Sequence, residues 1–82
     1  MQEQQITGLQ IRAARGALNW SVQNLSDACG VGTATIVRYE IALGVPSSRK
    51  NNLEHIRKAL EAAGIEFIGT PENGPGIRIH TK

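Results

Sequence analysis

Residues 21–41 read SVQNLSDACGVGTATIVRYEI, and this stretch decides the fold. It begins with Ser21, a residue type favoured at helix N-caps, and continues with apolar residues at helical spacing. Gly30 follows, at the point where a helix often needs a left-handed residue. A second helical pattern starts directly after Gly32. The stretch therefore predicts two short helices joined by a very tight turn.

The second of these helices is expected to have two different faces. Its inner positions are Val31, Ile36 and Tyr39, and Leu43 continues the same apolar pattern. The positions on or beside its free face are Thr33, Ala34, Thr35, Val37 and Arg38. On such a face, threonine can meet methyl groups or acceptors in the major groove of DNA, and arginine can meet guanine.

A helix is also predicted before this pair, from Ile6 to Leu18. Its apolar positions recur at helical spacing and are expected to face the core, although Gly8 and Gly16 weaken the pattern. These positions are Leu9, Ala13, Ala14 and Ala17, with Ile11 and Leu18 flanking them.

After the pair, Gly44 and Pro46 end the helical pattern, and a further helix begins near Asn51. Asn51 is expected to cap it, and Glu54 three residues later resembles a capping box. Its apolar stripe consists of Leu53, Ile56, Leu60 and Ala63, and Gly64 ends it.

The chain changes character after Gly64. The segments 65–68 and 77–80 are short and rich in β-branched residues, and TPENGPG between them is typical of a turn. They predict a β-hairpin, which must pack on the helices or pair with another chain because an isolated hairpin is marginally stable. The fold class is therefore mainly α, with four or five short helices and a short C-terminal hairpin.

Composition narrows the possible functions. The chain has 82 residues, which is room for one compact domain. Its single cysteine, Cys29, excludes an internal disulfide and a zinc finger. His55 and His80 lack spaced partner ligands, and the carboxylates show no paired arrangement, so we expect no metal, no cofactor and no enzymatic activity. No apolar run is long enough to cross a bilayer and no signal peptide is visible, so we expect a cytoplasmic protein.

The net charge of +2 is modest, but its distribution is uneven. Five basic residues lie between positions 38 and 58, where only Glu40 and Glu54 oppose them. They are Arg38, Arg49, Lys50, Arg57 and Lys58. This segment is electropositive enough to contact phosphates, although a solvated helix face followed by a basic loop would give the same pattern.

Residues 11–40, IRAARGALNWSVQNLSDACGVGTATIVRYE, resemble the helix-turn-helix of the lambda-repressor-like and Cro-like bacterial regulators, the XRE family. Several landmarks of that family occur in order. They are Arg15, Ser21, Leu25, Ala28, Gly30, Val31, Thr35, Ile36, Arg38 and Glu40. The resemblance implies a lambda repressor-like DNA-binding domain over residues 1–64, with its helix-turn-helix at 21–41. Residues 65–82 would then be an extension and a candidate dimerisation element.

The resemblance also implies roles for single residues. Arg15 and Glu40 would form a structural ion pair. The base-contacting positions would be Thr33, Ala34 and Arg38, with Thr35 and Val37 beside them. The phosphate-contacting positions would be Ser21, Gln23, Arg49 and Lys50. Two departures from the family pattern are Val22, where a glutamine is common, and Gly32, where a serine caps the helix.

These observations predict a sequence-specific transcriptional regulator of double-stranded DNA, a repressor, which inserts the helix at 33–41 into the major groove as a homodimer. An alternative is an antitoxin that binds its own operator and a toxin protein. A pure protein-interaction module on the same fold is also open, because fold does not fix function. Two dimer surfaces are possible. One is the hairpin, and the other is the helix that begins near Asn51 together with the chain ends.

Overall fold

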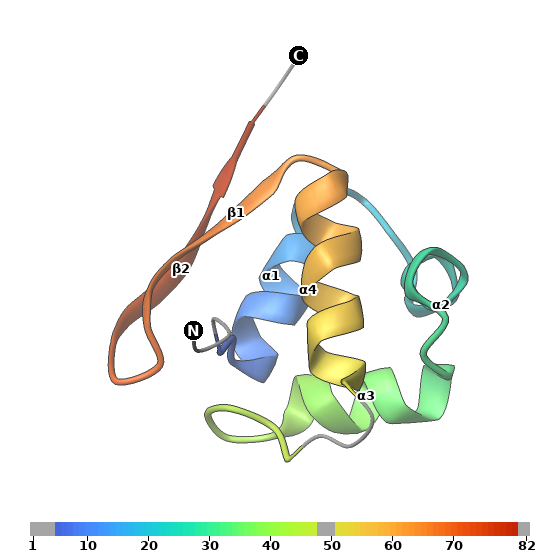
Figure 1. The fold of residues 1–82 in the computed structure, drawn as a ribbon, viewed down its shortest axis with the longest axis horizontal. Coiled ribbons are helices and arrows are strands. Elements are labelled where there is room, and N and C mark those ends of the chain that lie inside the picture. The colour runs from blue at the N-terminus through green and yellow to red at the C-terminus, as the bar shows by residue number, and fades with distance from the viewer. Residues whose placement is uncertain (1–4, 48–50, 81–82) are drawn as a thin grey trace.

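The structure, a computed structural model, describes residues 5–47 and 51–80 of the chain. These residues form four helices followed by a two-stranded antiparallel hairpin, which confirms the predicted mainly helical fold (Figure 1). The elements are α1 (Gly8–Ala17), α2 (Val22–Cys29), α3 (Thr33–Ile41), α4 (Asn52–Ala62), β1 (Ile65–Thr70) and β2 (Asn73–Ile79). Helix α1 packs against α3, α4 and β2, while α4 also contacts α2 and β1.

The first two helices begin at capping boxes. Before α2, the Ser21 hydroxyl accepts a hydrogen bond from the Asn24 amide at 3.0 Å, and the Asn24 side chain accepts one from the Ser21 amide at 2.9 Å. Thr7 and Gln10 make the same reciprocal pair before α1. Because Thr7 holds an extended backbone to make this cap, α1 starts at Gly8 and not at Ile6 as predicted.

The core is shared by all four helices and the hairpin. It contains Ile6, Ile11, Ala14, Leu25, Val31, Ile36, Tyr39, Ile56, Leu60, Ile65 and Phe67. The predicted inner positions of α3, Val31, Ile36 and Tyr39, are all buried. In α4 the predicted stripe is also confirmed, since Ile56 and Leu60 are fully buried and Leu53 and Ala63 are half-buried.

The predicted inner face of α1 was only partly correct, because Ile11 and Ala14 are buried but other predicted positions are not. Leu9 is 68% exposed, and Ala13 and Ala17 are exposed as well. The buried face instead carries Gly8, Gln10, Ile11 and Ala14. Alanines recur on several sides of this helix, so their spacing does not define one face, and the packing partners of α1 choose it.

Two further expectations around α3 and α4 were wrong. Leu43 is 99% exposed because α3 ends at Ile41 and the backbone of Ala42 is extended, which breaks the helical spacing. Asn51 precedes α4 but makes no side-chain cap hydrogen bond, because its backbone is left-handed, with φ 60° and ψ 23°. The Glu54 carboxylate instead forms an ion pair with Lys58 at 2.9 Å.

The hairpin is longer than predicted, since its strands cover 65–70 and 73–79. Ile65 pairs with Ile79 and Phe67 with Ile77, and the register shifts between Ile68 and Thr70. The residues read as a turn therefore lie mostly within strands.

The buried side chain of Gln10 joins this hairpin to α1. Its amide donates to the carbonyl oxygens of Gly76 at 2.8 Å and Ile68 at 3.2 Å, while its oxygen accepts from the Thr7 amide at 2.8 Å. One side chain thus satisfies groups from the start of α1 and from both strands.

Gly8 and Gly16 give a matched pair for testing how α1 packs. A methyl group at Gly8 would collide with the Tyr39 carbonyl oxygen, whereas one at Gly16 meets nothing within 4 Å. We expect Gly8→Ala to lower the free energy of unfolding by about 1 to 3 kcal/mol through overpacking. Gly16→Ala should raise it by about 0.5 to 1 kcal/mol, because alanine favours the helix. Urea denaturation measures both, and equal effects would contradict this packing.

Gln10→Ala tests the link to the hairpin. It removes the partner of the buried Thr7 amide and a donor to two carbonyls, so we expect the free energy of unfolding to fall by about 1 to 3 kcal/mol. Gln23→Ala is the control, because Gln23 is exposed and its side chain bonds only across one helical turn to Asp27. A loss no larger than that of the control would show that the Gln10 contacts do not hold the hairpin.

Candidate nucleic-acid interface

The turn between α2 and α3 fixes how α3 is presented. Gly30 ends α2 with a left-handed backbone, at φ 78°, which glycine adopts without strain. Val31 is only 4% exposed and belongs to the core, and Gly32 precedes α3 without a side-chain cap. The two short helices joined by a tight turn that the sequence predicts are therefore present.

Helix α3 separates its predicted site residues from its core residues. Its buried residues are Ile36 and Tyr39. Those exposed to solvent are Thr33, Ala34, Val37 and Arg38, and Thr35 is half-buried. Thr35 is thus the one predicted base-contacting residue that the fold partly covers. Ile41, which the sequence pattern does not single out, is 74% exposed at the end of the same helix.

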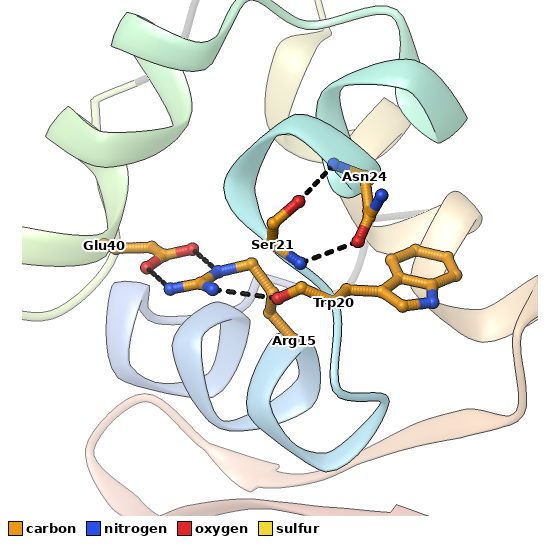
Figure 2. A network of polar contacts seen from close by, with 5 residues as sticks. All are labelled: Arg15, Trp20, Ser21, Asn24 and Glu40. Carbon is orange, nitrogen blue, oxygen red and sulfur yellow. Dashed lines mark hydrogen bonds and ion pairs between the residues drawn. The ribbon is translucent and has the colours of Figure 1, made fainter.

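An arginine fork fixes α3 against α1 (Figure 2). Arg15 donates from Nε to Glu40 Oε2 at 2.8 Å and from Nη2 to Glu40 Oε1 at 2.9 Å. Its third group, Nη1, donates to the Trp20 carbonyl oxygen at 2.9 Å. The ion pair implied by the resemblance is present. The bond to the Trp20 carbonyl oxygen also ties the segment before α2 to α1, and the sequence pattern does not reveal this bond.

The hydrogen bonds of this fork favour the charged form of Arg15. Hydrogen bonding to Glu40 raises the pKa of the Arg15 guanidinium above its ordinary value, although burial acts in the opposite direction. The Glu40 side chain is 7% exposed and that of Arg15 is 22% exposed. A carboxylate this well buried needs its partner, because an unpaired buried charge is costly.

Ser21 and Gln23 lie at the start of α2, where phosphate contacts were predicted. The Ser21 amide is occupied by the Asn24 side chain, so the hydroxyl proton of Ser21 is the group left to donate to a phosphate. Gln23 is exposed and its amide donates to Asp27 at 2.9 Å. The other two predicted phosphate contacts, Arg49 and Lys50, lie outside the described residues.

Arg38 is exposed but does not extend freely from α3. Its guanidinium carbon lies 5.8 Å from the centroid of the Tyr39 ring, a cation–π contact. Such a contact at an exposed site is worth about 0.5 to 1 kcal/mol, so the side chain can leave the ring to reach a base at small cost.

Cys29 is half-buried, and burial raises the pKa of its thiol, which disfavours the reactive thiolate. Within residues 5–47 and 51–80, no three histidine, cysteine or acidic side chains gather closely enough to hold a metal ion. In the same part of the chain, none of the helices has the length and apolar character needed to cross a membrane.

Neither a scan against protein-family models nor a search among curated proteins finds a match for this chain.

The fork predicts unequal effects of mutating its two ends. Arg15→Met leaves the buried Glu40 carboxylate unpaired, and we expect a loss of about 3 kcal/mol in the free energy of unfolding. Glu40→Gln should cost only about 1 to 2 kcal/mol, because glutamine still accepts a hydrogen bond and Arg15 is more exposed. Chemical denaturation measures both. Lys58→Ala removes a 64% exposed lysine that pairs with Glu54 across one turn of α4, and it should change stability by less than about 0.5 kcal/mol. Losses at Arg15 and Glu40 as small as at Lys58 would contradict this role.

Proposed function

We propose that this chain is a sequence-specific regulator of transcription that binds double-stranded DNA by inserting α3 into the major groove. The observation that carries the proposal is the division of α3 into two faces. Ile36 and Tyr39 bury one face in the core. The other face presents side chains such as Val37 and Arg38 to solvent. The width of the major groove admits a helix displayed in this way.

The rigidity of the frame supports the same proposal. Base recognition requires that a side chain be held close to its productive position, which packed helices achieve better than loops. The bonds from Arg15 to Glu40 and to the Trp20 carbonyl hold α3, α1 and the start of α2 together. The reading helix is therefore oriented before DNA arrives.

A homodimer is part of the proposal because a single reading helix buries little surface and discriminates weakly. Two copies related by a two-fold axis would place their α3 helices about 34 Å apart and read two half-sites. Binding to an operator would block transcription, so we propose a cytoplasmic repressor. The hairpin, with Ile79 51% exposed, is a candidate contact between the copies.

A second candidate is an antitoxin that also holds a toxin protein. Two apolar side chains outside α3 favour a protein partner, since Leu9 is 68% and Leu43 is 99% exposed. Co-expression with the product of an adjacent gene, followed by size-exclusion chromatography, distinguishes this candidate. A stable complex of two different chains would support it, and a homodimer alone would not.

Duplex selection from a random pool, followed by fluorescence anisotropy, tests the proposed function. We expect a preferred site with two-fold symmetry and an affinity that falls as salt rises, because bound phosphates release counterions. Arg38→Ala should weaken binding to the preferred site by about 1 to 3 kcal/mol and relax specificity at one base pair.

Arg12→Ala is the matched control, because Arg12 is an exposed arginine on α1 outside the helix-turn-helix. This variant removes the same charge and should keep the sequence preference. If the wild-type chain binds no duplex in a salt-dependent way, the proposed function is wrong. Equal losses for Arg12→Ala and Arg38→Ala would show that Arg38 contributes only charge.

A further inference from the structure

One strip of the exposed surface of α3 is apolar. Ala34, Val37 and Ile41 follow one another at intervals of three and four residues, so they lie along one side of the helix. Val37 is 47% exposed and Ile41 is 74% exposed, and none of the three side chains can form a hydrogen bond. A surface that reads DNA through this side must use something other than hydrogen bonding.

Among the groups that base pairs present in the major groove, the C5-methyl of thymine is the apolar one. An apolar side chain placed against any other base edge covers donors or acceptors without replacing their bonds to water, which is unfavourable. Against thymine, it buries a methyl group from water, which is favourable. The chemistry of this side of α3 therefore selects thymine.

Val37 is the residue best placed to make this contact. A valine in a helix is almost restricted to one rotamer, so its methyl groups occupy a fixed position and cannot turn away. Ala34, one turn earlier, is small enough to let the helix approach the base edges closely. Arg38 beside it has a long side chain that rests on the Tyr39 ring and can move without displacing Val37.

We infer that Val37 is a specificity-determining residue that recognises the methyl group of a thymine in each half-site. The inference rests on the proposed function and adds the base that this position of α3 selects. Where Arg38 favours guanine through hydrogen bonds, Val37 favours thymine through apolar contact.

Replacing thymine by uracil in the selected duplex tests the inference, because only the methyl group is lost. At the thymine facing Val37, we expect uracil to weaken binding roughly fourfold per half-site, the effect of one buried methyl group. Val37→Ala should bind the thymine duplex more weakly and lose most of the difference between thymine and uracil. Leu9→Ala, which removes an exposed apolar side chain from α1, should keep the whole difference.

The possible failures are distinguishable. Wild-type protein that binds thymine and uracil duplexes equally, with normal salt dependence, overturns the role of Val37 and leaves the proposed function intact. An unchanged thymine preference in Val37→Ala also overturns it. If Val37→Ala instead dissociates the dimer, measured by sedimentation, Val37 is a subunit contact and the inference is wrong. Absence of any duplex binding overturns both proposals.

Discussion

The three-way contact of Arg15 is the interaction on which the rest of the structure depends. Two of its groups bind Glu40 and the third binds the carbonyl oxygen of Trp20, so one guanidinium joins α1, the segment before α2 and the end of α3. The planar, rigid shape of the guanidinium allows these bonds at once. A domain of this size has a small core, and such a fork fixes helix orientation that apolar packing alone leaves less well defined.

Helix α1 therefore connects the hairpin to α3. Through Arg15 it orients α3, and through Gln10 it binds the carbonyl oxygens of Ile68 and Gly76 in the hairpin. Its first residue, Gly8, allows close contact with Tyr39 at the end of α3. Figure 1 shows α1 and α4 side by side, with the hairpin on one side of them and α2 on the other. A change in the packing of α1 would thus affect the hairpin and α3 together.

The outer side of α3 combines two kinds of chemistry. Arg38 supplies hydrogen-bond donors and charge, whereas Val37 and Ala34 supply apolar surface. Hydrogen-bonding residues distinguish bases by their donors and acceptors, and apolar residues distinguish thymine by its methyl group. In the proposed function, this surface would therefore select different bases at neighbouring positions without a larger recognition helix.

The sequence by itself determined the features that depend on local patterns. The Ser21 cap, the end of α2 at Gly30, the two faces of α3 and the Ile56–Leu60 stripe all follow from spacing and residue type within one turn or two. Only the tertiary structure decided which face of α1 is buried. The alanines of this helix fit several faces, and Gln10 on the buried face contacts Gly76, which lies 66 positions away in the sequence. It also decided that Leu43 points to solvent and that Arg15 binds Trp20 as well as Glu40. These features depend on contacts between separate elements, and the local spacing of residues within one element does not determine such contacts.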